Sequence, residues 1–273
     1  MAPRKGNLMT VRTDVKVLDA TIRDGGLCNN FEFTDEFVTE LYKTNIKSGV
    51  DYMEFGYRAS KNLFDPEKFG KWKFCDEEDI RSIVGDNVSD LKIAVMADVG
   101  RCDFKEDFVP KSESVIDMVR VACYIHQIPA AIEMIEHFHN LGYETTCNIM
   151  AISQANNDQL DEALEMLGNS SVDVVYLVDS YGSLYPESAG ALAKKYLEMG
   201  EKYGKAIGFQ TCKHILNIIA PYNAACFKRK HIIFNEGKQT VKIILGILKE
   251  AQKKLHCTVS CTSAHRKSSC IKI

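Results

Sequence analysis

The sequence predicts an α/β protein, a (β/α)8 TIM-type barrel that is incomplete or altered after its sixth or seventh strand. From residue 15 to 208, short apolar segments alternate with amphipathic segments of helical length. Such alternation is typical of parallel strands joined by helical crossovers, and six or seven units within about 200 residues favour a barrel over an open doubly wound sheet. Beyond residue 208 the alternation is lost.

The expected strands are short and rich in β-branched or other apolar residues. Near-continuous apolar runs are typical of strands that are covered on both faces. Six strands are expected at residues 15–21, 52–57, 92–99, 118–124, 144–152 and 172–180, and a seventh is expected to start at 205–209.

The segments between the strands carry start and stop signals for helices. Segment 34–49 begins at Thr34, has acidic residues in its first turn and ends at Gly49. The same kind of signals, with Pro near the start and Gly near the end in two cases, bound the segments 129–142, 157–170 and 185–204.

Composition indicates an ordinary globular chain. Of its 273 residues 45% are hydrophobic and 26% are charged, which is enough to build a sizeable core. The basic N-terminus is not followed by an apolar stretch, so we expect no signal peptide, and no apolar run is long enough to span a membrane. The ten cysteines form no CxxC pair. We therefore expect reduced thiols in a cytoplasmic protein.

The distribution of charge divides the chain at about residue 209. Residues 209–273 carry twelve Lys and Arg against two acids, together with five of the ten cysteines, whereas residues 1–208 carry 22 bases and 35 acids. Such a break is typical of a separate domain or a basic tail, and a frameshifted reading would look the same. We divide the chain into an N-terminal extension (1–13), a barrel (14–208) and a divergent basic, Cys-rich tail (209–273).

Polar side chains collect where the expected strands end. Catalytic groups of such barrels come from the carboxyl ends of the strands. A charge inside an apolar strand is costly unless it is paired or bound to a metal, so the ensemble indicates a functional site. For any single residue, an ion pair that ties loops together is the alternative. The residues are Asp19, Arg23, Asp24, Glu54, Arg58, Asp98, Arg101, Arg120, His126, Asn148, Asp179 and Ser180.

The best-defined candidate is the stretch LDATIRDGG at residues 18–26. A carboxylate at a strand end, such as that of Asp24, can ligate a hard divalent cation. The adjacent Arg23 can hold a carboxylate or stabilise an enolate oxygen. Gly25 and Gly26 predict a sharp turn close to a ligand. The same Asp-Gly-Gly run is also common in ordinary turns.

In this place the stretch resembles the Asp-x-Thr-x-Arg-Asp-Gly motif of the metal-dependent aldolases and lyases related to 4-hydroxy-2-oxovalerate aldolase and 3-hydroxy-3-methylglutaryl-CoA (HMG-CoA) lyase. These are barrels of the pyruvate carboxyltransferase type. YMEFGYR, with Glu54 and Gly56, is similar to the second strand of that family, and YLVDSYGSLYPE, with Asp179 and Ser180, is similar to the sixth. The resemblance covers about residues 14–208, and the NNFEF that follows the first motif is most similar to the aldolase branch.

The resemblance implies a lyase that splits a 4-hydroxy-2-oxo acid into pyruvate and an aldehyde. Asp24 would hold a divalent metal, Mn or Mg, and the metal and Arg23 would stabilise the enolate. A base must take the proton of the 4-hydroxyl group. The further catalytic candidates are Glu54 and Ser180, and the candidates for substrate binding are Arg120, Asn148 and Asp179.

Two departures from the family pattern concern the base and the metal. The aldolases have a histidine where this chain has Leu27, and His126, in the loop after the fourth strand, is a candidate replacement base. Gln210 and Cys212 stand where the family has a His-x-His pair on strand seven. Strand periodicity places Gln210, Cys212 and His214 on one face, so Cys212 and His214 are candidate replacement ligands. A thiolate ligand would shift the metal preference towards Zn.

Three functions therefore stay open. The first is an aldolase-type lyase, or a related synthase that condenses an acyl-CoA with a 2-oxo acid. The second is a catalytically impaired or inactive relative with a divergent C-terminus. The third is a binding or interaction protein whose basic tail contacts an acidic partner or nucleic acid. The tail lacks the interleaved aromatics that are expected of single-strand nucleic-acid binders. We expect a small-molecule 2-oxo acid, no nucleic acid and no membrane, with a homo-oligomer or a dehydrogenase partner left open.

Overall fold

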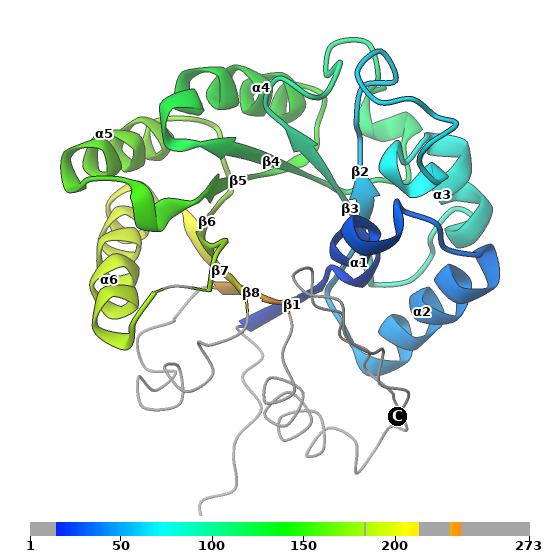
Figure 1. The fold of residues 1–273 in the computed structure, drawn as a ribbon, viewed down its shortest axis with the longest axis horizontal. Helices are drawn as coiled ribbons and strands as arrows, with labels where there is room; N and C mark the ends of the chain where they lie inside the picture. The colour runs from blue at the N-terminus through cyan, green and yellow to red at the C-terminus, as the bar shows by residue number, and fades with distance from the viewer. Residues whose placement is uncertain (1–14, 183, 213–229, 236–273) are drawn as a thin grey trace, which may run out of the picture.

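The structure, a computed structural model, describes residues 15–182, 184–212 and 230–235. Eight parallel strands follow one another in chain order around a closed barrel, and the last strand pairs with the first. Helices lie around the outside of the barrel (Figure 1). The predicted α/β TIM-type barrel is confirmed. In the described residues, strands and helices alternate as far as the seventh strand. The sequence predicts an altered barrel after that point.

Seven of the strands lie close to their predicted positions. They are β1 (Val15–Asp19), β2 (Tyr52–Tyr57), β3 (Lys92–Asp98), β4 (Met118–Tyr124), β5 (Glu144–Met150), β6 (Val174–Asp179) and β7 (Ala206–Cys212). The eighth, β8 (Lys230–Asn235), falls where no strand was predicted, because its apolar run is shorter than the runs that indicate strands. It pairs with β7 on one side and β1 on the other.

The predicted helices are also present. They are α2 (Asp35–Ser48), α4 (Ile128–Asn140), α5 (Asn157–Gly168) and α6 (Pro186–Tyr203). The structure adds α1 (Thr21–Asn29), α3 (Glu77–Val84) and the 3-10 turns η1 (Lys71–Lys73), η2 (Lys111–Glu113), η3 (Ile125–Gln127) and η4 (Ile152–Gln154).

The prediction of a sharp turn at Gly25 and Gly26 is wrong, because both glycines lie inside α1. The Asp24 N–H donates to the Ala20 carbonyl at 2.9 Å, as a helix requires. Packing explains why residue 26 is a glycine: a Cβ there would lie 2.1 Å from an atom of the Phe31 ring. The motif that follows β1 therefore starts a helix.

The two faces of the strands have different partners. Outward side chains form the main apolar cluster with the helices, for example Val95, Val121 and Leu177. Inward side chains form a separate small cluster within the barrel, which contains Leu18, Tyr52, Ala94, Met118, Val174 and Tyr176. Further along the same inward rows come the polar residues Glu54, Arg120, Asn148 and Gln210, all buried.

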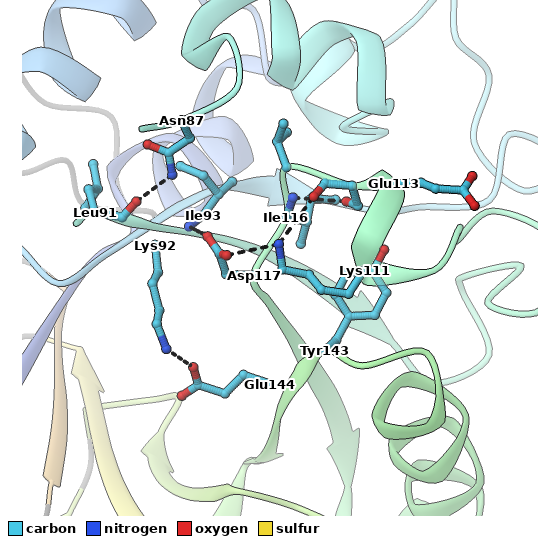
Figure 2. Close-up of polar contacts among 12 residues, drawn as sticks. Asn87, Leu91, Lys92, Ile93, Lys111, Glu113, Ile116, Asp117, Tyr143 and Glu144 are labelled. Carbon is cyan, nitrogen blue, oxygen red and sulfur yellow. Dashed lines mark hydrogen bonds and ion pairs between the residues drawn. The ribbon is translucent and has the colours of Figure 1, made fainter. Parts of the chain in front are cut away.

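At the amino ends of the strands, an aspartate directly before β2, β4 and β6 binds the backbone of the strand that precedes it in the chain. Each aspartate side chain accepts a hydrogen bond of 2.8 Å from the backbone N–H of one residue in the preceding strand. The backbone N–H of the aspartate donates to the carbonyl of that strand residue. Figure 2 shows this for Asp117, which holds Ile93 and also pairs with Lys111 at 3.2 Å. The other two pairs are Asp51 with Val17 and Asp173 with Thr145.

Loss of one such carboxylate should weaken the barrel. In Asp117→Ala the buried N–H of Ile93 loses its acceptor, so we expect the free energy of unfolding to fall by about 1–3 kcal/mol. Asp117→Asn should lower the free energy of unfolding by less, because the amide oxygen of asparagine can still accept the hydrogen bond from the Ile93 N–H. Urea unfolding measures both, with the exposed Asp90→Ala as control. Equal losses in Asp117→Ala and Asp90→Ala would contradict this role.

Candidate active site

A buried carboxylate, that of Glu54 on β2, lies between two buried arginines. Its Oε2 accepts from Nε of Arg23 at 2.8 Å, and its Oε1 accepts from Nη1 of Arg120 at 2.6 Å. Glu54 and Arg120 are 0% exposed and Arg23 is 4% exposed. Burial would raise the pKa of Glu54, but the charges of Arg120 and Arg23 hold that pKa below its ordinary value. Glu54 is thus an ionised anchor for both guanidinium groups.

Arg23 on α1 keeps one donor unused. Its Nε is bound to Glu54 and its Nη1 is paired with Asp24, while its Nη2 is buried without a hydrogen-bond partner within 3.5 Å among the described residues. The Tyr57 side chain also interacts with the Arg23 guanidinium, but beyond that distance. Burial would lower the pKa of Arg23, but the charge of Glu54 raises it, so the side chain stays a cation. A desolvated guanidinium with a free N–H can bind a carboxylate or another anionic oxygen.

The predicted substrate-binding residues Arg120 and Asn148 lie together inside the barrel. Nη2 of Arg120 donates to Oε1 of Gln210 at 3.1 Å, and Nδ2 of Asn148 donates to the same oxygen at 3.4 Å. The Arg120 guanidinium lies over the Tyr176 ring, 4.8 Å from its centroid. These groups bind one another, and Arg120 joins them to Glu54.

Asp98, at the end of β3, is a third carboxylate whose charge acts on Arg23, besides those of Glu54 and Asp24. Its Oδ1 is buried without a hydrogen-bond partner in the described part of the chain. Burial raises the pKa of Asp98, while the charges of Lys73, Arg101 and Arg23 lower it by less. A carboxylate with a raised pKa can exchange a proton nearer neutral pH than an ordinary one can.

The first aspartate of the motif has a structural role. The Asp19 carboxylate accepts from the N–H of Thr21 at 3.2 Å, from the Thr21 hydroxyl at 2.5 Å and from Nδ2 of Asn45 at 2.9 Å. These contacts fix the start of α1 against α2. Asp19 and Thr21 therefore position the helix that carries Arg23 and Asp24.

Three predicted site residues lie outside this cluster of contacts. The Ser180 hydroxyl accepts from the N–H of Ala151 at 3.0 Å and so ties the loops after β5 and β6 together. Asp179 is buried at the end of β6 and accepts from the N–H of Leu184 at 3.3 Å. His126 is exposed on η3 and stacks on Tyr124, with ring centroids 5.9 Å apart. Their catalytic or binding roles stay predictions.

Sequence reasoning missed Tyr57 and Lys73, which lie beside the cluster. Lys73 is only 8% exposed, and its Nζ lies 4.5 Å from the centroid of the Tyr57 ring. The sequence around Lys73 is KWKF, in which this lysine stands between Trp72 and Phe74. Large aromatic neighbours on both sides indicate a partly buried lysine, and this pattern could have identified it.

The described residues do not make up a divalent-metal site. Oδ2 of Asp24 is buried without a hydrogen-bond partner among them, as the oxygen of a metal ligand would be. However, no group of three or more His, Cys, Asp or Glu that could hold a metal occurs in the part of the chain that the structure describes. The Gln210 oxygen is already engaged by Arg120 and Asn148. The Cys212 side chain and His214 lie outside the described positions.

Comparison with known proteins confirms the resemblance at low identity. No family model matches the chain. The chain is 24% identical over 186 residues to an oxaloacetate decarboxylase of Mycobacterium tuberculosis, which covers 67% of this chain and 52% of the relative. It is 24% identical over 204 residues to a 4-hydroxy-2-oxovalerate aldolase of Geobacillus thermodenitrificans. That match covers 74% of this chain and 57% of the relative. The chain thus spans about half the length of these relatives.

Solved structures support the fold. The HMG-CoA lyase of Bacillus subtilis matches with a TM-score of 0.64 at 12% identity, covering 90% of this chain and 95% of the lyase. The carboxyl transferase domain of Rhizobium etli pyruvate carboxylase matches with a TM-score of 0.60 at 13% identity. That match covers 81% of this chain and 40% of the carboxylase chain. None of the helices in the described ranges is both long and apolar enough to cross a membrane.

Proposed function

We propose that this barrel, whose relatives include aldolases and whose fold is that of HMG-CoA lyase, is a C–C lyase that splits a 4-hydroxy-2-oxo acid into pyruvate and an aldehyde. The observation that carries the proposal is the buried, charged Arg23, which is clamped by Glu54 with one N–H unused. The names of the two relatives support the substrate class, since oxaloacetate and 4-hydroxy-2-oxovalerate share a 2-oxo carboxylate.

The chemistry that these residues could supply is charge stabilisation. When the bond between C3 and C4 breaks, its electron pair forms a double bond between C3 and C2, and negative charge develops on the oxygen attached to C2. The free Nη2 of Arg23 would hold the substrate carboxylate or the developing enolate oxygen in a site of low dielectric, where such a contact has its largest effect. Asp98, whose pKa is raised by burial, is our candidate to accept the proton of the 4-hydroxyl group.

Metal dependence is a separate part of the proposal. Asp24 would supply a carboxylate to Mn²⁺ or Mg²⁺, as the resemblance implies, and Cys212 and His214 remain the predicted further ligands. If Cys212 is a ligand, Zn²⁺ becomes the preferred ion.

Pyruvate release tests the function. The full chain is incubated with 4-hydroxy-2-oxopentanoate, and pyruvate is followed through NADH oxidation by lactate dehydrogenase. Parallel samples contain a chelator, Mn²⁺, Mg²⁺ or Zn²⁺. We expect pyruvate at a rate proportional to protein concentration in at least one sample. A folded protein that releases no pyruvate in any sample would contradict the proposal and favour the inactive relative.

A further inference from the structure

Strand β2 carries a bulge just before its carboxyl end. Glu54 pairs with Ala94 of β3, and the next pair is Tyr57 with Met96, so two residues of β2 stand opposite one residue of β3. Such a bulge changes the direction of the side chains that follow it, and bulges are common next to active sites. Tyr57 therefore does not point where strict alternation along β2 would place it.

The two residues of the bulge, Phe55 and Gly56, both face the outer layer. The rings of Phe55 and Trp72 have their centroids 5.5 Å apart. A Cβ on residue 56 would lie 1.9 Å from the carbonyl oxygen of Trp72, so position 56 faces the same neighbour and needs a glycine. Because two successive positions face outward, the alternation shifts by one residue, and Tyr57 falls in the inward row that holds Glu54.

This shift brings Tyr57 beside the guanidinium group of Arg23. Glu54, the preceding member of the inward row, binds Nε of Arg23 at 2.8 Å. The Tyr57 side chain interacts with the same guanidinium, yet Nη2 of Arg23 has no hydrogen-bond partner in the described ranges. The charge of Asp98, two residues beyond Met96 on β3, also acts on Tyr57. Tyr57 thus borders the unused donor of Arg23.

Packing fixes the position of the Tyr57 ring. The Phe31 ring meets it edge-on, with centroids 5.7 Å apart and an angle of 88° between the planes. Nζ of Lys73 lies 4.5 Å from the Tyr57 centroid. A ring held in this way loses little further freedom when its hydroxyl group binds a ligand. Tyr57 is still partly exposed, so a ligand can reach it.

The phenol of Tyr57 stays protonated at neutral pH. Burial raises the pKa of Tyr57 to about 12, although the charge of Arg23 opposes that effect. A protonated phenol is a neutral hydrogen-bond donor, and its bond to an oxygen strengthens as that oxygen gains negative charge. Such a donor stabilises a transition state with a developing oxyanion more than it stabilises the ground state.

We infer that the Tyr57 hydroxyl group and Nη2 of Arg23 donate together to the oxygen on C2 of the 2-oxo acid, which makes Tyr57 a further catalytic residue. The substrate rests on the proposed function, to which Tyr57 adds a second donor for the developing enolate oxygen. Tyr57 keeps its proton throughout. Neither donor occupies Oδ2 of Asp24, so both are compatible with a divalent metal held there.

Removal of one hydroxyl group tests the pair of donors. Tyr57→Phe keeps the ring that contacts Phe31 and Lys73 but lacks the donor. The full chain and the variant are titrated calorimetrically with oxalate in the presence of a chelator, Mn²⁺ or Mg²⁺, and the affinity for pyruvate is measured by displacement of oxalate. Oxalate has an anionic oxygen where pyruvate has a neutral carbonyl oxygen. We expect Tyr57→Phe to weaken oxalate binding at least about 10-fold and pyruvate binding by less.

Tyr143 provides a matched control at the opposite end of the barrel. It directly precedes β5, and its hydroxyl group donates to the Val109 carbonyl at 2.6 Å. Tyr143→Phe also removes one phenolic hydroxyl group, but it should leave both affinities unchanged. Circular dichroism checks that each variant is folded.

The possible outcomes separate Tyr57 from the proposed function. Equal oxalate affinity of the unchanged chain and Tyr57→Phe, or no oxalate binding to the folded unchanged chain, would overturn the inference. An equal loss for oxalate and pyruvate would assign Tyr57 a structural role and overturn it as well. Pyruvate release at the full rate in Tyr57→Phe would overturn the inference alone. Oxalate binding that needs Tyr57, without pyruvate release in any sample, would support the pair of donors and count against the proposed lyase.

Discussion

Arg23→Lys should lower kcat/KM for pyruvate release by at least about 100-fold, the scale expected when one donor that stabilises developing charge is lost. Lysine keeps the positive charge but has no planar set of donors. It cannot pair with Glu54 and Asp24 and still offer an N–H to a substrate oxygen. Steady-state kinetics of the variant against the unchanged chain measure the loss.

A surface arginine provides the control for Arg23→Lys. Arg81 pairs with Glu77 at 2.9 Å on the outside of the barrel, so Arg81→Lys should leave kcat/KM unchanged. Thermal unfolding of both variants separates a catalytic loss from a folding defect. If folded Arg23→Lys retains the activity of the unchanged chain, Arg23 does not hold the reacting group.

Glu54→Leu should lower the free energy of unfolding by about 3–5 kcal/mol, because it leaves the buried cations of Arg23 and Arg120 without their shared partner. Glu54→Gln should cost less, since an amide oxygen can still accept one hydrogen bond. Urea unfolding provides the comparison. Glu40→Gln, which removes an exposed partner of Lys43, should change stability by less than about 0.5 kcal/mol.

The stability contributed by Glu54 should depend on pH in a definite direction. The pKa of Glu54 is held below its unfolded value by Arg120 and Arg23, despite burial, so its contribution is fully present above the unfolded pKa. It is lost as the pH falls through the lower, folded pKa. The stability gap between the unchanged chain and Glu54→Gln should therefore narrow on acidification. A gap that widens would show that Glu54 is not the anion of this cluster.

Much of the barrel could be predicted because strand and helix periods are local properties of the sequence. The first strand and α2 illustrate this, since apolar runs and the signals at Thr34 and Gly49 mark their ends. The helix α1 was missed because Gly25 and Gly26 are poor helix formers, and tertiary packing of the Phe31 ring overrides that tendency. β8 was missed because pairing with two neighbouring strands, rather than its own short apolar run, defines it.

The site could be predicted only in part. Arg23, Glu54 and Arg120 were found because charges in apolar strands or at their ends need partners, and the structure shows the pairs that result. The position of Lys73 depends on rings from separate loops, such as Phe31 and Phe64, which have no spacing that a sequence pattern could reveal.

The central claim, that the free N–H of Arg23 receives a 2-oxo acid, can be tested directly by calorimetric titration with oxalate, which resembles the enolate of pyruvate in shape and charge. Titrations with and without a chelator compare the unchanged chain with Arg23→Lys. We expect saturable binding at one site per chain, weakened at least about 10-fold in Arg23→Lys, as expected for loss of a charged hydrogen bond. Equal affinity in both proteins, or no binding to the folded unchanged chain, would contradict it.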